Sequence, residues 1–564
     1  MNWKLKRKYT TLLEQEKGYV KKIWGKDNTI CLAYPHYYRT GMSNLGFQTV
    51  YKIFNEQPSF LCERVFLPDA GGEAEFAAGR ADFFSIENQK PIAEFDILAF
   101  SLSFENDYPN ILTMLALAGI PLTAKERSED HPLVIGGGIA ATLNPEPIAV
   151  FFDLFILGEA EGSLPVFTRI FEEARSSGLS RADMLIRMQK NLPQAYVPGL
   201  YDVQYFPDSR IKAIGPIVSG LPERIKISPI KDINSFCTNE VISAPRTEME
   251  DMYLTEVNRG CARSCRFCAA SFIYRPVRFR SYEKIIASID RGLTEKKKIG
   301  LVGTAVSDHP ELSRICEYIL AKNGRAGIGS LRVDQINETI VGLFKAHGIE
   351  TIALAPEAGS QRLRDLLRKG ITEEDIMRCA ELLIENEITN LRLYFMIGLP
   401  SETEKDIDAI IDLVKKIQHH ALQQTRGKRI FRSITLSINQ FIPKPTTPLQ
   451  WCALADVNSA GKKIRKIVSA FGRNKQIRVI HDVPKWNYVQ ALLSLGDRKT
   501  GDILIAVHRL HGNWAQALKE VNVNADFYVY RPKQFDEILP WDIIDSGTSR
   551  KALISEYKKA MENE

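Results

Sequence analysis

Two stretches of the chain alternate short apolar runs with segments whose apolar residues recur every three or four positions. In the first stretch, residues 28–177, the apolar runs predict strands at 29–34, 62–66, 96–103, 132–136 and 153–157. Helical spacing between them predicts helices at 44–55, 108–118 and 162–175. Alternating strands and helices are typical of a parallel, doubly wound sheet, which binds ligands beyond the carboxyl ends of its strands.

The second stretch, residues 251–452, repeats this alternation. Its predicted strands are 253–257, 299–303, 327–333, 351–355, 390–397 and 433–441, with helices between them such as 282–294 and 404–419. Six strand and helix units predict a partial, TIM-like (β/α)6 barrel, open on one side, whose chemistry lies at the carboxyl ends of its strands.

Three further segments complete the predicted organisation. Residues 1–27 are polar and lysine-rich, and we expect a helical extension that packs on the next domain. Residues 178–250 contain several prolines and predict an irregular but structured connector. Residues 453–564 predict a small, mainly helical C-terminal region that closes the open side of the barrel.

Composition places few limits on function. The chain has 564 residues, of which 45% are hydrophobic and 25% charged, and this is ordinary for a soluble protein of about two to four domains. A net charge of +6 is too mild to indicate nucleic acid. The basic stretches 426–432 and 462–466 are better explained as solvated faces, although they do not exclude RNA. Neither a signal peptide nor an apolar run of about 18 residues is present, so we expect a cytoplasmic protein without a membrane span.

Three of the nine cysteines are clustered. Cys261, Cys265 and Cys268 follow the first strand of the second stretch with the spacing C-x3-C-x2-C. A four-iron four-sulfur (4Fe-4S) cluster takes one thiolate per iron, so this motif would leave one iron open to a small molecule. A structural zinc site needs four ligands, and no fourth Cys or nearby His follows at zinc-like spacing. Free thiols of this kind fit a reducing compartment.

The cysteine motif resembles that of the radical S-adenosylmethionine (radical SAM) superfamily, and Phe267 matches the aromatic position common there. The resemblance implies that the three cysteines hold a catalytic 4Fe-4S cluster whose free iron chelates SAM. It also implies cleavage of SAM to a 5'-deoxyadenosyl radical, with the electron supplied by a reductant such as flavodoxin or ferredoxin.

The resemblance extends to later strand ends and implies a set of SAM contacts. Residues 355–370 resemble the segment that contacts the SAM ribose and carboxylate, and residues 439–451 resemble the final strand beside the adenine. Residues 303–305 (Gly-Thr-Ala) stand where many relatives have Gly-Gly-Glu, so the sequence departs from the family at the residues that hold the SAM amino group. The implied contacts are Phe267, Gly303, Thr304, Glu357, Ser360, Arg392 and Phe441. Glu357 and Arg392 also fit a structural salt bridge.

Three strand-end loops of the first stretch resemble the cobalamin-binding, Rossmann- or flavodoxin-like domain that precedes the barrel in one class of radical SAM enzymes. The implied cobalamin contacts are Ser101, Ser103, Gly136, Gly137, Gly138, Gly158 and Glu159. Glycines in such loops are also expected from tight turns alone. The Asp-x-His-x-x-Gly signature of cobalamin-dependent mutases is missing, and His36 in the first loop is better explained as an ordinary loop histidine.

These resemblances imply a cobalamin-dependent radical SAM enzyme that methylates an unactivated carbon, of a largely uncharacterised subgroup. Three alternatives stay open: radical chemistry without methylation, such as ring formation or oxidation, a methylthiotransferase, and a non-catalytic iron-sulfur module. A methylthiotransferase carries a second three-cysteine cluster in its first domain, where this chain offers only Cys31 and Cys62. Cys452 is expected to be a buried thiol. No motif identifies the substrate.

Overall fold

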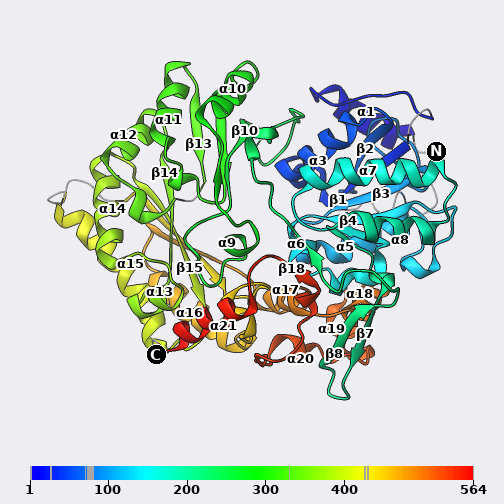
Figure 1. Ribbon diagram of the computed structural model, residues 1–564. Helices are drawn as coiled ribbons and strands as arrows, with labels where there is room; N and C mark the ends of the chain where they lie inside the picture. Colours follow the sequence, from blue (N-terminus) through cyan, green and yellow to red (C-terminus); the bar gives the residue numbers. More distant parts are fainter. Residues whose placement is uncertain are drawn as a thin grey trace.

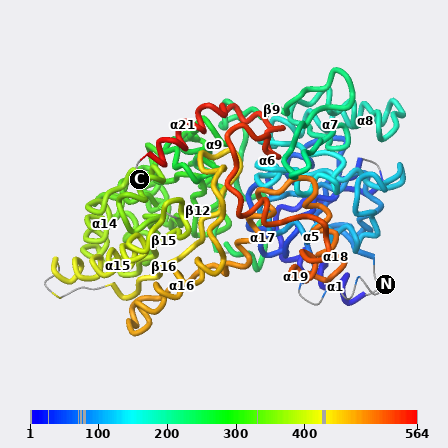
Figure 2. Tube along the Cα trace, turned by 90° about the horizontal axis from the view of Figure 1, so that it is seen from below, coloured from blue at the N-terminus to red at the C-terminus, as the bar shows by residue number. Residues whose placement is uncertain are grey.

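The computed structural model describes residues 3–25, 28–69, 72, 76, 82–249, 251–329, 331–424, 427 and 431–562. Two α/β units lie side by side, and the C-terminal region runs across both (Figures 1 and 2). Most of the basic stretch 426–432 lies outside the described residues, whereas 462–466 belongs to helix α16 (Val457–Phe471). Within the described part of the chain, no helix is long and apolar enough to cross a membrane.

The first unit is built on a six-stranded sheet in the order β2-β1-β3-β4-β5-β6. Its strands are β1 (Asn28–Tyr37), β2 (Phe60–Leu67), β3 (Ile97–Ser101), β4 (Leu133–Gly137), β5 (Leu154–Ile156) and β6 (Ala195–Tyr196). The first five strands are parallel and β6 is antiparallel to β5. All five predicted strands are confirmed, and the order 2-1-3-4-5 is that of flavodoxin-like sheets, which bind ligands at the switch between β1 and β3.

Both faces of this sheet are buried. Ile30 and Leu32 of β1 pack with helices α3 (Leu45–Glu56) and α7 (Ala160–Ser176). The alternate residues Cys31 and Ala33 pack on the other face with α5 (Tyr108–Leu117). Because side chains on both sides of the strand enter a core, β1 is apolar throughout instead of alternating.

The C-terminal region completes the core of the first unit. Its helices α17 (Pro484–Leu495), α18 (Thr500–Arg509), α19 (Trp514–Glu520) and α20 (Ala525–Val529) share an apolar cluster with α5. The predicted helical character is therefore confirmed, but these helices pack around α5 of the first unit, and in the described part of the chain they do not close the second unit. The last helix, α21 (Arg550–Met561), instead contacts α13 (Gln361–Leu366) of the second unit.

The second unit contains two four-stranded sheets, ordered β11-β10-β12-β13 and β14-β15-β16-β17. A parallel bridge between Leu331 and Leu354 joins them. The strands are β10 (Met252–Arg259), β11 (Arg278–Phe279), β12 (Lys298–Gly303), β13 (Arg325–Ile328), β14 (Thr351–Glu357), β15 (Asn390–Ile397), β16 (Ser433–Gln440) and β17 (Ile477–His481). All six predicted strands are present, although β13 is shorter. Strand β17 was not predicted. It is a parallel neighbour of β16 and lies within the residues assigned to the C-terminal region.

Helices cover only one face of these sheets. They are α10 (Tyr282–Leu293), α11 (Leu312–Ala321), α12 (Glu338–Ala346), α14 (Glu373–Glu385), α15 (Glu404–Gln424) and α16. Leu391, Leu393 and Phe395 of β15 pack beneath them. The alternate residues Arg392 and Tyr394 remain exposed or half-buried. The uncovered face of the second unit is therefore open to a ligand.

The connector is more regular than its prolines predict. It contains α8 (Arg181–Asn191), the hairpin of β7 (Tyr201–Tyr205) and β8 (Ile211–Pro216), and β9 (Ile225–Lys226). Strand β9 pairs with β18 (Ile544–Asp545), so the connector holds the end of the chain. Ser180 caps α8 by accepting a hydrogen bond from the Asp183 amide, a local start signal that the sequence analysis overlooked.

An ion pair without solvent contact fixes the N-terminal extension, whose helix is α1 (Trp3–Glu14). The Arg64 guanidinium donates to Glu16 Oε2 at 2.6 Å and to Glu87 Oε1 at 2.6 Å, and all three side chains are fully buried or nearly so. Burial raises the pKa of Glu87 to about 7, although the charge of Arg64 opposes the rise. The extension is thus bound to β2 by charge as well as by apolar contact.

We predict that Arg64→Met lowers the free energy of unfolding by about 3–5 kcal/mol, because it leaves two carboxyl groups buried without a cation. Glu16→Gln should cost less, about 1–2 kcal/mol, because Arg64 keeps Glu87 as a partner. Denaturant unfolding followed by tryptophan fluorescence measures both. Equal losses in the two variants would contradict the assignment of Arg64 as the centre of this cluster.

Candidate active site

The cysteine loop begins where β10 ends. Gly260 has a φ of +80°, and a Cβ atom at this position would overlap the Tyr274 carbonyl, so the turn into the loop requires glycine. Cys261 and Cys268 are half-buried and Cys265 is buried. The Cys268 amide donates to the Cys265 carbonyl at 3.1 Å, and helix α9 (Ala270–Ile273) follows.

The charges of two cations act on the buried thiol of the loop. Burial raises the pKa of Cys265, and the charges of Lys369 and Arg332 oppose this rise. Among the described residues, no three Cys, His, Asp or Glu side chains surround a common point as for a single metal ion. A 4Fe-4S cluster does not require such convergence, because each thiolate binds a different iron. Three thiols in one loop beside two cations therefore fit an anionic cluster better than they fit zinc.

Some of the residues implied for SAM lie on the open face of the second unit, and others do not. Glu357 lies at the end of β14 in the left-handed region, with a φ of +67°, and pairs with Lys369 at 2.9 Å. Arg392 is exposed on β15. Ser360 serves the structure instead: its hydroxyl caps α13 and donates to Asp406 Oδ1 at 2.6 Å. Its predicted ligand contact therefore competes with an existing hydrogen bond.

Two aromatic residues implied for SAM, one of them in the cysteine loop, share one apolar cluster. Phe441 is 2% exposed, and Phe267 is partly buried against the same cluster. Cys452 belongs to this cluster too, and burial raises its pKa to about 12. The interpretation of Cys452 as a buried thiol fits this placement.

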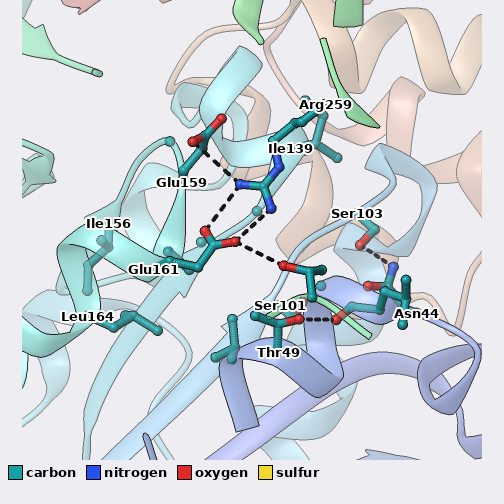
Figure 3. A pocket seen from close by; sticks show the side chains of 18 of the residues that line it. Asn44, Thr49, Ser101, Ser103, Ile139, Ile156, Glu159, Glu161, Leu164 and Arg259 are labelled. Atoms are coloured by element: carbon teal, nitrogen blue, oxygen red, sulfur yellow. Dashed lines mark hydrogen bonds and ion pairs between the residues drawn. The ribbon is translucent and has the colours of Figure 1, made fainter. Parts of the chain in front are cut away.

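A pocket of about 370 Å³ lies between the two units (Figure 3). It opens at the carboxyl ends of the first sheet, where doubly wound folds bind ligands. All seven residues implied for cobalamin line it, together with two of those implied for SAM: Ser101, Ser103, Gly136, Gly137, Gly138, Gly158, Glu159, Gly303 and Thr304. The second unit also contributes Asn258 and Arg259 of β10. We call this space the interdomain pocket.

Local packing explains part of the glycine pattern in this pocket. A Cβ atom on Gly136 would lie 2.9 Å from Phe152 and Phe155, and one on Gly138 would lie 2.5 Å from the Leu102 carbonyl. Side-chain packing requires Gly136 within β4, and the turn requires Gly138, whatever the pocket holds. Polar contacts come from Ser103, whose hydroxyl accepts a 3.1 Å hydrogen bond from Asn44 (Figure 3).

The pocket adjoins the cysteine loop through β12. A Cβ atom on Gly303 would overlap Asn258 Oδ1, and the Thr304 hydroxyl accepts a 3.3 Å hydrogen bond from the Gly260 amide. Asn258 is 1% exposed, and its Oδ1 has no hydrogen-bond partner among the described residues. Gly303 and Thr304 therefore connect the pocket wall with the start of the loop.

The carboxylate of Glu159 is already bound to two arginines. It lies 2.7 Å from Arg278 Nη2. It also lies 3.4 Å from Arg259 Nη1 (Figure 3). Glu159 lines the pocket, but its carboxylate already has two partners. It is therefore less free to contact a cofactor than the resemblance implies. The arginines, which come from the second unit, were missed because nothing in their local sequence marks an interdomain partner.

The histidine and cysteine residues that the structure describes in the first unit form no metal-binding group. The His36 ring accepts a hydrogen bond from the Tyr37 amide at 2.8 Å and does not line the interdomain pocket. Cys31 and Cys62 are buried on opposite faces of the first sheet. They cannot contribute to one cluster.

A second cavity, of about 920 Å³, lies between the connector and the C-terminal segment. Thr446 lines it with a φ of +60°, unusual for a β-branched residue, and a buried hydroxyl that has no partner among the described residues. The sequence analysis did not identify this residue.

Comparisons with known proteins agree with the two units. A family model described as "Radical SAM proteins, N-terminal" matches residues 46–198, and one described as "Radical SAM superfamily" matches residues 255–414. The chain is similar to "Uncharacterized protein MJ0966" of Methanocaldococcus jannaschii, with 28% identity over 428 residues, which are 75% of this chain and 82% of that protein.

Two other relatives match a smaller part of the chain. Threonylcarbamoyladenosine tRNA methylthiotransferase MtaB of Aquifex aeolicus is 24% identical over 176 residues, 29% of this chain and 42% of that protein. Anaerobic magnesium-protoporphyrin IX monomethyl ester cyclase of Rubrivivax gelatinosus is 27% identical over 158 residues, 27% of this chain and 28% of that protein. The match thus spans less than half of either relative.

Solved structures of low sequence identity also align with the chain. The radical S-adenosylmethionine methyltransferase TsrM from Kitasatospora setae aligns with a TM-score of 0.46 and 13% identity, over 73% of each chain. The cobalamin-dependent S-adenosylmethionine radical enzyme OxsB with aqua-cobalamin bound aligns with a TM-score of 0.49 and 13% identity, over 85% of this chain and 66% of that one. The two family matches show that this chain contains radical SAM domains, in the order that the first sheet and the cysteine loop predict.

Proposed function

We propose that this enzyme is a cobalamin-dependent radical SAM methyltransferase that adds a methyl group to an unactivated carbon. The observation that carries the proposal is the interdomain pocket. It joins the strand-end loops of the first sheet to Gly303 and Thr304, beside the cysteine loop. A methyl carrier and a radical generator must face one substrate carbon, and a pocket between the two units is where they would meet.

The residues present fit the cofactors in kind. Cys261, Cys265 and Cys268 would hold the cluster, and Lys369 and Arg332 would offset its negative charge. The small residues of the three strand-end loops give the interdomain pocket a wall that a flat ring can approach closely. At about 370 Å³ the enclosed pocket is at the lower end of small-molecule sites, so part of a bound corrinoid would extend beyond it.

When bound, the cluster supplies the electron that cleaves SAM, and cobalamin supplies a carrier for the methyl group. The net reaction consumes two SAM molecules and two electrons. One SAM loses its methyl group and leaves S-adenosylhomocysteine, and the other gives methionine and 5'-deoxyadenosine, which keeps the hydrogen atom taken from the substrate. The protein's part is to hold the reacting groups in register and to exclude water.

Neither alternative enzyme fits the site as well. A methylthiotransferase would need a second cluster in the first unit, where Cys31 and Cys62 lie on opposite faces of the sheet. Radical chemistry without methylation, such as ring formation, would leave the interdomain pocket to the substrate. This second candidate is favoured if the pocket retains no corrinoid.

We predict that Cys261→Ala, Cys265→Ala and Cys268→Ala each prevent cluster assembly, because each removes the ligand of one iron. Iron and sulfide content and visible absorption after anaerobic reconstitution measure this. Cys452→Ala, which changes a buried thiol outside the loop, should keep wild-type iron content. A full complement of iron in any loop variant would contradict the assignment.

We also predict that the reconstituted enzyme retains cobalamin on gel filtration and, with SAM and dithionite, produces both 5'-deoxyadenosine and S-adenosylhomocysteine. Ser101→Leu should weaken cobalamin retention about tenfold, since the larger side chain fills the interdomain pocket. Ser177→Leu, at the exposed end of α7, is the matched control. 5'-Deoxyadenosine without retained corrinoid would reject the methyltransferase and favour the second candidate.

A further inference from the structure

Six charged side chains meet beside the interdomain pocket, at the boundary between the two units. Three are carboxylates and three are guanidinium groups, and the side chain of each is at most 12% exposed. They are Glu159, Glu161, Glu256, Arg259, Arg278 and Arg280. Opposite charges are therefore present in equal number, as the burial of ionised groups requires.

The two units contribute unequally to this balance. The second unit supplies all three arginines but only one of the carboxylates, Glu256. The first unit supplies the other two, Glu159 and Glu161, from the start of α7. Without the first unit, the second would keep an excess of positive charge at this boundary. Contact with α7 is thus an electrostatic requirement of the second unit.

Arg259 is the centre of the network. Its Nη2 lies 2.6 Å from Glu161 Oε1, and its Nε lies 2.9 Å from Glu256 Oε1 (Figure 3 shows the contacts with Glu159 and Glu161). The guanidinium fork therefore links the first unit with β10. Burial opposes the ionisation of Glu161, but its hydrogen bonds with Arg259 and the charge of Arg259 outweigh burial and lower its pKa.

Arg259 also lies at the point where the cysteine loop leaves the sheet. It is the last residue of β10, next to Gly260 and two positions before Cys261. The backbone at Gly260 is packed closely, because a Cβ atom there would overlap the Tyr274 carbonyl oxygen. A displacement of Arg259 would therefore move the start of the loop.

We propose that Glu161 is a positioning residue that acts through Arg259 to set where the cysteine loop leaves β10. The inference rests on the proposed function to the extent that the loop holds the cluster, and it does not require cobalamin or methylation. It gives the first unit a role in cleaving SAM even though Glu161 touches none of the three cysteines in the described contacts.

The test must distinguish an effect on the position of the cysteine loop from an effect on the stability of the contact between the two units. Glu161→Gln keeps the shape of the side chain but leaves three guanidinium groups against two carboxylates. The double variant Glu161→Gln with Arg259→Gln leaves two of each and restores the balance. Removing one member of a buried ion pair is costly, whereas removing both is often nearly neutral. Stability and loop position should therefore respond differently to the double change.

We expect Glu161→Gln to keep its iron but to form 5'-deoxyadenosine about 10- to 100-fold more slowly, with a lower thermal midpoint. The double variant should regain most of the thermal midpoint while 5'-deoxyadenosine formation stays slow. These measurements use the full-length, anaerobically reconstituted enzyme with SAM and dithionite. Recovery of the rate together with the midpoint would overturn the proposal, because the network would then serve stability alone.

Glu105→Gln is the matched control. Glu105 is also a buried carboxylate of the first unit, 7% exposed in its side chain, and it pairs with Lys444 of the second unit at 2.5 Å. Its partner Lys444 lies in the segment after β16, and not in β10, the strand that leads into the cysteine loop. The same loss of rate in Glu105→Gln as in Glu161→Gln would reject a specific role for Arg259.

The electron paramagnetic resonance spectrum of the reduced cluster separates failure of this inference from failure of the proposed function. Glu161→Gln should change that spectrum, and Glu105→Gln should not. A wild-type enzyme that binds a cluster but cleaves no SAM would reject the proposed function, and the spectrum would still decide the inference. An unchanged spectrum in Glu161→Gln, with a wild-type rate, would overturn it.

Discussion

The burial of three arginines at one boundary constrains the rest of this structure. Arg259 and Arg278 belong to β10 and β11, which flank the cysteine loop, and Arg280 directly follows β11. Their charges cannot be removed from water without carboxylate partners. Two of these partners come from the start of α7 in the other unit. The loop that would hold the cluster, the pocket beside it and the contact between the two units are therefore parts of one arrangement.

Elements with a periodic pattern could be predicted from the sequence, and so could the residues whose role is local. The five parallel strands of the first sheet and the position of the cysteine loop after β10 follow from short apolar runs and from spacing. Seven residues of the strand-end loops, namely four glycines, two serines and one glutamate, meet in one pocket. They do so because the carboxyl ends of parallel strands share one edge of the sheet.

Other features could not be predicted, because their causes are far apart in sequence. Arg259 and Glu161 are 98 residues apart, and neither shows in its neighbours that the other is its partner. Strand β17 was missed because one short apolar segment carries no signal without the strand it pairs with. Ser360 and Glu159 match family motifs, yet each is engaged by the protein itself, so a motif alone did not establish a free side chain.

The helices α17–α20 have a consequence for how the chain is made. They complete the core of the unit that is synthesised first, yet they come from residues 484–529. At roughly 5–20 residues per second, synthesis leaves α5 without its contacts to these helices for tens of seconds. The core of the N-terminal unit is therefore completed late, unlike that of a domain that folds as soon as it emerges from the ribosome. The residues that line the interdomain pocket end at Thr304, so they are translated before the helices that complete this core.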